Sequence, residues 1–126
     1  MSRILIIDDD PSFRRVVRQF LEQEGHDVID AESGESGLRL FRSEPPDLVV
    51  TDIFMPGIGG LQTIETIREE SPGTPIIAIS GRDGIAAATL LPDGKAADRN
   101  LQKPFRRRAL IETIEQLLSL DGDQPD

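Results

Sequence analysis

The chain has 126 residues, enough for one domain with a sizeable core but too few for two. It carries 23 acidic and 14 basic side chains and a formal charge of -9. This charge argues against direct nucleic-acid binding, which needs a basic face for phosphate groups. The absence of cysteine excludes disulfides and thiolate metal sites. The amino terminus shows neither a signal-peptide pattern nor a membrane span, so we expect a soluble, cytoplasmic protein with no membrane partner.

Short apolar runs alternate with amphipathic segments along the chain, the first predicting strands and the second helices. In chain order, strands are expected at residues 4–7, 28–31, 47–52, 76–79 and 99–102. Helices are expected from Pro11 to Gly25, before Pro45, across Leu61–Ile67, near Ile85–Leu91 and across Leu110–Leu118. The domain is expected to occupy residues 1–120, followed by a disordered acidic tail at 121–126.

The pattern of these elements predicts the fold class. The central run of Leu48, Val49 and Val50 has no polar alternation, which is typical of a parallel strand covered on both faces. Parallel strands need crossover connections, and helices supply them. Five strands alternating with five helices therefore predict an α/β fold with a doubly wound, five-stranded parallel sheet.

Polar side chains stand where four of these strands end. Asp8 and Asp9 follow the first strand, Asp52 ends the third, Ser80 follows the fourth and Lys103 follows the fifth. The carboxyl ends of parallel strands meet at one edge of a sheet, where open α/β folds bind their ligands. We therefore expect these five side chains to converge.

The chemistry of this set points to phosphoryl transfer. Two carboxylates about 4 Å apart repel by roughly 4 kcal/mol at an effective dielectric of about 20, so three of them require a cation. Oxygen ligands without histidine or cysteine favour Mg²⁺ as the cofactor. Asp52 would be the nucleophile that forms an acyl phosphate. Mg²⁺ and Lys103 would neutralise the transferring oxygens, and Ser80 would donate a hydrogen bond.

Four separated motifs carry a family resemblance. In order, they read ILIIDDDPSFRRVVRQFLEQEGHDVIDAESGESGL, PDLVVTDIFMPGIGG, PIIAISGR and LQKPF. From about Arg3 to Leu118 the chain resembles a response-regulator receiver domain of bacterial two-component signalling, the CheY-like family. The resemblance implies a flavodoxin-like three-layer sandwich, with strand order 2-1-3-4-5 and five flanking helices.

The resemblance also implies a role for each site residue. Asp52 would accept phosphate from a histidine kinase or phosphotransfer protein. Ser80 would be the switch hydroxyl, and Lys103 would contact the phosphoryl group. The phosphorylated domain would signal through a conformational change to an unknown downstream protein or effector domain. Such a domain assists only its own phosphorylation and dephosphorylation, so we do not expect a turnover enzyme.

The metal ligands implied by the resemblance come from two of the motifs. Asp9 and Asp52 would bind Mg²⁺ directly, together with the backbone carbonyl of Phe54. Asp8 would act through a water molecule.

The chain departs from the family pattern near its fifth strand. The family usually has tyrosine or phenylalanine three residues before the lysine, and here that position is Asn100. Gly-Ala-Asp normally precedes the last strand, whereas this chain has Ala96, Ala97 and Asp98. After the switch hydroxyl the family favours alanine, and this chain has Gly81. All three departures fall on the face that most receivers use for output, so we expect an unusual or mobile fourth helix within Gly81–Asp98.

Two alternative functions remain open. Asp8, Asp10 and Ser12 are similar to the first motif of haloacid-dehalogenase-like phosphatases, with Ser80 and Lys103 as possible later motifs. That family, however, needs a further acidic pair after the lysine. The other alternative is a phosphorylation-independent interaction module with a receiver fold, and the intact acidic set speaks against it.

Overall fold

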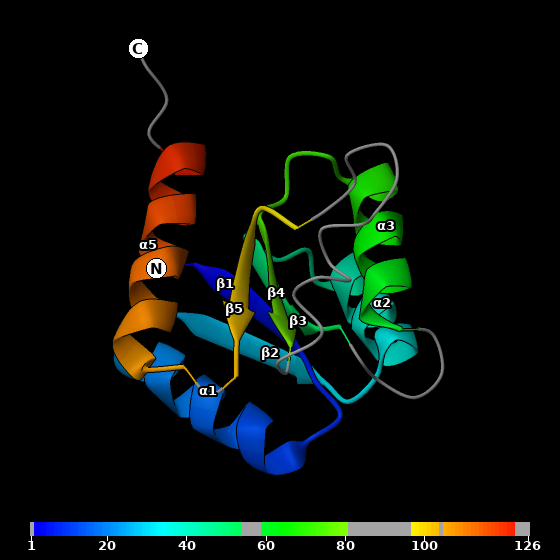
Figure 1. Ribbon diagram of the computed structural model, residues 1–126. Helices are drawn as coiled ribbons and strands as arrows, with labels where there is room; N and C mark the ends of the chain where they lie inside the picture. The colour runs from blue at the N-terminus through cyan, green and yellow to red at the C-terminus, as the bar shows by residue number, and fades with distance from the viewer. Residues whose placement is uncertain (1, 54–58, 81–96, 104, 123–126) are drawn as a thin grey trace.

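The protein is described by a computed structural model that covers residues 2–53, 59–80, 97–103 and 105–122. At its centre lies one parallel sheet with strand order β2-β1-β3-β4-β5 (Figure 1). The strands are β1 (Arg3–Ile7), β2 (Asp27–Ala31), β3 (Leu48–Asp52), β4 (Ile76–Ser80) and β5 (Arg99–Gln102). The described helices are α1 (Pro11–Gln23), α2 (Gly34–Ser43), α3 (Gly60–Glu70) and α5 (Arg107–Gly122). The predicted sheet and its strand order are confirmed.

Helices cover both faces of the sheet. Figure 1 shows α1 and α5 on one face and α2 and α3 on the other. Strand β1 shows why both faces need cover, because its side chains alternate between two separate cores. Ile4 and Ile6 pack into the α1–α5 core, whereas Leu5 and Ile7 pack into the α2–α3 core. The predicted three-layer arrangement is therefore present.

Helix α1 begins and ends where its sequence signals predict. The Asp10 side chain accepts hydrogen bonds from the backbone N–H groups of Ser12 and Phe13, so it caps the helix directly before Pro11. After the helix, Gly25 has a φ angle of 89°, a left-handed conformation that glycine adopts without a steric penalty. The Asp10 cap fixes the chain between β1 and α1, where the predicted site residues Asp8 and Asp9 lie.

Four of the five predicted helices lie within the described ranges. The helix predicted near residues 85–91 lies outside the described residues, as does most of the segment predicted to be unusual. Helix α5 runs to Gly122, two residues past the predicted domain boundary, and that boundary stays a prediction. Among the helices described, none combines the length and the apolar character needed to cross a membrane.

Candidate functional site

The carboxyl edge of the sheet brings the predicted polar residues together. Asp8 and Asp9 directly follow β1, Asp52 is the last residue of β3 and Ser80 is the last residue of β4. Lys103 follows β5 by one position. Asp52 is paired with Ile79 in the register of β3 and β4, so Asp52 and Ser80 reach the same level of the sheet. The site is thus a consequence of parallel strands that end at one level.

The Asp8 side chain is buried, with a relative exposure of 1%. Its backbone N–H donates to the carbonyl of Ala31 at 3.1 Å, which extends the pairing of β1 and β2 by one residue. Its carboxylate accepts a hydrogen bond from the backbone N–H of Asp10 at 2.9 Å, and its carbonyl accepts one from the Arg14 guanidinium at 2.7 Å. These contacts with β2, with α1 and with the residue that caps α1 fix the position of Asp8.

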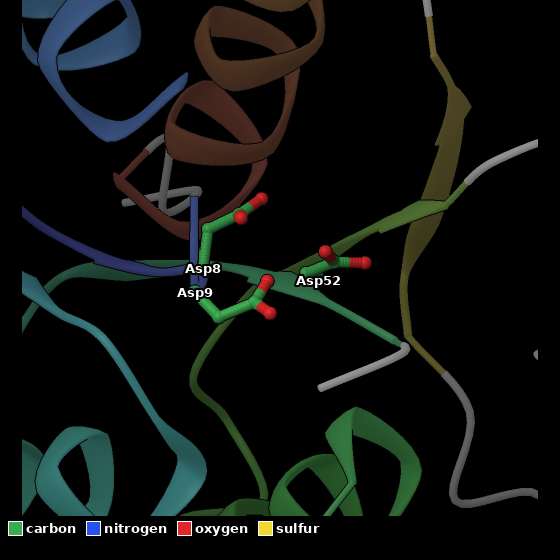
Figure 2. Close-up of side chains that lie close together, drawn as sticks. All are labelled: Asp8, Asp9 and Asp52. Atoms are coloured by element: carbon green, nitrogen blue, oxygen red, sulfur yellow. The ribbon is translucent and has the colours of Figure 1, made fainter. Parts of the chain in front are cut away.

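Three carboxylates meet at this edge. Asp8, Asp9 and Asp52 each offer one carboxylate oxygen, and these three atoms lie within 4.8 Å of one another. Figure 2 shows their side chains extending into the same region from the ends of β1 and β3. The Asp9 side chain is exposed, whereas Asp8 and Asp52 are buried. The cluster is therefore open to solvent on the side of Asp9.

Close packing between β3 and α3 positions Asp52. The backbone N–H of Gly60, at the start of α3, donates to the carbonyl of Ile53 at 2.7 Å. A Cβ atom on Gly60 would lie 2.0 Å from the carbonyl oxygen of Asp52, closer than any side chain tolerates. The Thr51 hydroxyl donates to the same carbonyl at 3.1 Å. Only glycine at residue 60 lets the helix approach the strand end this closely.

Lys103 supplies the cation of the site. Its backbone N–H donates to the carbonyl of Ser80 at 2.7 Å, and this bond places it beside the end of β4. Its ammonium group lies 3.0 Å from a carboxylate oxygen of Asp8 and 3.5 Å from one of Asp52. Burial lowers the pKa of Lys103, but the hydrogen bond to Asp8 and the charges of Asp8 and Asp52 outweigh burial and raise it. The lysine therefore stays charged at neutral pH.

Ser80 brings a buried hydroxyl to the site. The residue has a relative exposure of 1%, and its hydroxyl oxygen has no hydrogen-bond partner in the described structure. A buried polar group without a partner costs about 1–3 kcal/mol. This hydroxyl is therefore ready to donate to an additional oxygen in the site.

The remaining sequence predictions have mixed outcomes. Phe54, the predicted backbone ligand, lies outside the described residues. Asn100 pairs with Ala78 in the register of β4 and β5, and its amide oxygen is buried with no hydrogen-bond partner in the described structure. Sequence reasoning did not connect Arg14 or Gly60 to the site. Glycine is most enriched just beyond the end of a helix, whereas Gly60 stands at the start of one. This position could have drawn attention to Gly60.

The donor set fits a small hard cation. Among the described residues of the site, three carboxylates face one ammonium, which leaves an excess of negative charge, and the Asp9 carboxylate is open to water. Mg²⁺ prefers oxygen ligands and keeps several of its waters, which matches a cluster exposed on one side. The described residues of the site include neither histidine nor cysteine, so they do not favour zinc or copper.

Comparison with known proteins identifies the class. Residues 4–115 match the response regulator receiver domain family, and the chain belongs to this family. A solved receiver domain from Clostridium thermocellum superposes with a TM-score of 0.90 at 27% identity and covers 97% of this chain and 98% of that one. The fold and the order of its strands are thus those of CheY-like receivers.

The chain spans nearly all of one curated relative and about half of another. It is 35% identical to the protein PilH of Pseudomonas aeruginosa over 121 residues, covering 94% of this chain and 99% of PilH. It is 38% identical to the transcriptional regulatory protein AfsQ1 of Streptomyces coelicolor, covering 94% of this chain and 52% of AfsQ1. The chain therefore matches relatives of its own length and also relatives about twice as long.

Proposed function

We propose that the protein is a phosphorylation-dependent signalling switch in which Asp52 accepts a phosphoryl group from a histidine kinase or phosphotransfer protein. The observation that carries the proposal is the meeting of three carboxylates, one ammonium and one free hydroxyl at the carboxyl edge of the sheet. Membership of the receiver family supports it. The family does not favour the phosphatase or the phosphorylation-independent module.

The transfer step uses the Asp52 carboxylate as the nucleophile. One of its oxygens attacks phosphorus, the bond from phosphorus to the donor nitrogen breaks, and the donor imidazole keeps the electron pair of that bond. The product is an acyl phosphate on Asp52. The phosphoryl group stays on the chain until water removes it, so we infer that the domain is not a turnover enzyme.

Lys103 and Ser80 would stabilise the charge on the transferred group. The ammonium already lies 3.5 Å from the Asp52 carboxylate, and two of its three N–H donors face Asp8 and Asp52. The third donor would face a phosphoryl oxygen. The Ser80 hydroxyl would donate to another such oxygen, and this bond would satisfy a group that is otherwise buried and unpaired.

Mg²⁺ is the metal we propose for the acidic cluster. Asp9 and Asp52 would bind it directly, Asp8 would act through water, and the carbonyl of Phe54 would complete the protein ligands, as the family resemblance implies. When bound, the ion would offset the charge of the carboxylates and of the phosphoryl oxygens.

The signal would pass to a downstream protein or effector domain. AfsQ1 is by its name a transcriptional regulatory protein, and the chain spans only about half of it. We propose that this domain does not contact nucleic acid directly, because its net charge is -9.

The test is incubation of the protein with acetyl phosphate, with and without Mg²⁺, followed by mass spectrometry. We expect one added phosphoryl group, located on Asp52 by peptide mapping, and none without the metal. Asp52→Asn is the matched variant, because it keeps the shape of the side chain and removes the nucleophile. Modification at another residue, or undiminished modification of Asp52→Asn, would rule the proposal out.

A further inference from the structure

The Lys103 ammonium has an aromatic neighbour in addition to its two carboxylates. Its nitrogen lies 4.2 Å from the centre of the Phe13 ring, on the first turn of α1. A cation over the face of an aromatic ring is attracted by the ring's negative face, and this attraction is stronger where the cation is shielded from water. Lys103 is half-buried, so water screens its contact with Phe13 only in part.

Phe13 is held at its backbone and at its ring. Its backbone N–H donates to the Asp10 carboxylate at 3.3 Å as part of the helix cap. Its ring meets the ring of Phe105 edge to face, with the centres 5.8 Å apart and the planes at 88°. Edge-to-face contacts of this kind add to the stability of an aromatic pair. The Phe13 ring is therefore a fixed surface against which the lysine lies.

We propose that Phe13 is a positioning residue that holds the Lys103 ammonium against Asp8 and Asp52 and thereby increases the rate at which Asp52 accepts a phosphoryl group. The inference rests on the function proposed above. It adds a residue that is not one of the three carboxylates, the serine or the lysine of the site. Phe13 acts through Lys103 and does not itself touch the reacting atoms.

The geometry explains why an aromatic residue is needed at this position. A lysine side chain has a flexible four-carbon stem, and holding it in one arrangement costs rotamer entropy. A leucine of similar bulk would still exclude water from the ammonium but would offer it no attraction. The ring both excludes water and attracts the charge, so it favours the arrangement in which the ammonium faces the carboxylates.

The test compares Phe13→Leu with Phe20→Leu, a control on the same helix. Phe20 also lies beneath a cation, because the Arg107 guanidinium is 5.3 Å from its ring centre, but it makes no cation–π contact with Lys103. Both variants lose one ring from the same face of α1. Acetyl phosphate is the donor, because a small molecule does not report on the docking of a protein to α1.

We expect Phe13→Leu to accept phosphate from acetyl phosphate about three to ten times more slowly than the unaltered protein. Phe20→Leu should react within about twofold of the unaltered protein, since its ring makes its cation–π contact with Arg107 and not with Lys103. Phe13→Tyr should restore the rate to within about twofold, because tyrosine keeps the face of the ring. Thermal unfolding of each variant establishes that it is folded under the conditions of the reaction.

Proton NMR gives a second measurement that does not depend on phosphorylation. Protons above a ring face are shifted upfield, so the methylene next to the Lys103 ammonium should resonate upfield in the unaltered protein and in Phe13→Tyr. The shift should disappear in Phe13→Leu and persist in Phe20→Leu. The chain has only two lysines, Lys95 and Lys103, which makes the assignment direct.

Two results would overturn the inference while leaving the proposed function intact. One is a Phe13→Leu protein that accepts phosphate on Asp52 at the unaltered rate. The other is an equal loss of rate in Phe13→Leu, Phe13→Tyr and Phe20→Leu, which would indicate a general effect of packing. If the unaltered protein accepts no phosphate at all, the proposed function fails and the role of Phe13 fails with it.

Discussion

At the scale of single residues, Asp9 and Asp10 are adjacent carboxylates with different surroundings. Asp9 belongs to the three-carboxylate cluster, whereas Asp10 caps α1. In Asp9→Asn we expect the metal-free protein to be slightly more stable, by about 1 kcal/mol or less, because one repulsive charge is lost. We expect Mg²⁺ to bind at least about tenfold more weakly, because a ligand charge is lost. The unfolding midpoint without Mg²⁺ measures the first effect, and its rise with Mg²⁺ concentration measures the second.

Asp10→Asn is the control for this prediction. It removes the same charge from the next residue but keeps the helix cap, since asparagine caps as well as aspartate does. Its response to Mg²⁺ should therefore stay close to that of the unaltered protein. An equal weakening of Mg²⁺ binding in both variants would show that only the net charge matters.

The ion pairs of Lys103 predict how the stability of the protein depends on pH. Its pKa in the folded protein is raised above its ordinary value of 10.5, because the Asp8 and Asp52 carboxylates outweigh the effect of burial. A raised pKa means that the folded protein holds the proton more tightly than the unfolded chain. The stability from this pair is thus fully present below pH 10.5 and is lost as the pH rises through the folded-state pKa.

The measurement is urea unfolding of the unaltered protein and of Lys103→Gln over a range of pH without metal. We expect Lys103→Gln to be less stable by about 1–3 kcal/mol at pH 7, because the buried Asp8 carboxylate loses its cation. The difference should stay constant to about pH 9 and shrink in strongly alkaline solution. A difference that already shrinks between pH 7 and pH 9 would contradict the raised pKa.

The residues at the strand ends could be predicted, whereas the residues that support them could not. Asp8, Asp9 and Asp52 were identifiable because an acidic residue directly after a buried run is a local pattern, and the parallel sheet brings such positions together. The contact of Phe13 with Lys103 joins residues 90 positions apart in the sequence. Phe13 also fits the apolar stripe of α1, and that pattern cannot distinguish a core residue from one that faces a charge.

At the scale of elements, the approach of α3 to β3 depends on one glycine. A Cβ on Gly60 would lie 2.0 Å from the Asp52 carbonyl oxygen and 2.4 Å from the Ile53 Cα, both backbone atoms that cannot turn aside. Gly60→Ala must therefore push the helix away from the strand end. We expect a loss of about 1–3 kcal/mol in unfolding free energy, as for other overpacked sites. Phosphorylation of Asp52 should slow as well, because the strand end that carries it shifts.

Gly73→Ala is the matched control. A Cβ on Gly73 meets no atom within 4 Å, so alanine there should change the unfolding free energy by only about 0.5 kcal/mol. Urea unfolding and the rate of reaction with acetyl phosphate measure the two variants side by side. Equal stability of Gly60→Ala and Gly73→Ala would show that α3 is not held at this distance.

Element boundaries were predictable where capping chemistry is local. Asp10 and Pro11 marked the start of α1, and Gly25 marked the turn after it. Strand β2 begins at Asp27, one residue earlier than predicted, because its first backbone N–H donates to the carbonyl of Ser2. That bond depends on a neighbouring strand, so no pattern within residues 28–31 could reveal it.

At the scale of the whole molecule, the two-sided core follows from apolar periodicity and from the connection rules of parallel sheets. Continuous apolar runs in β1, β3 and β4 indicated strands buried on both faces, and their residues divide between the two cores. The order of the strands could not be predicted from apolar periodicity, because no property of a single strand specifies its neighbours. It came from the resemblance to receiver domains.

The extent of the domain is a whole-molecule prediction, and truncation tests it. Helix α5 closes one face of the sheet through Leu110 and Ile114, which are fully buried, and Leu117, which is 5% exposed. A chain shortened to residues 1–120 keeps all three, so its unfolding midpoint should stay within about 3 °C of the unaltered protein. A chain shortened to residues 1–109 loses them.

Losing these three side chains should unfold the shorter chain. Each buried leucine or isoleucine contributes about 2–5 kcal/mol, and a domain has only about 5–15 kcal/mol of net stability in total. The 1–109 chain should therefore lack a cooperative thermal transition, and adding Mg²⁺ should not restore one. Circular dichroism of both chains, with and without Mg²⁺, measures this. A folded 1–109 chain would mean that α5 is dispensable, and an unfolded 1–120 chain would place the boundary of the domain further along the sequence.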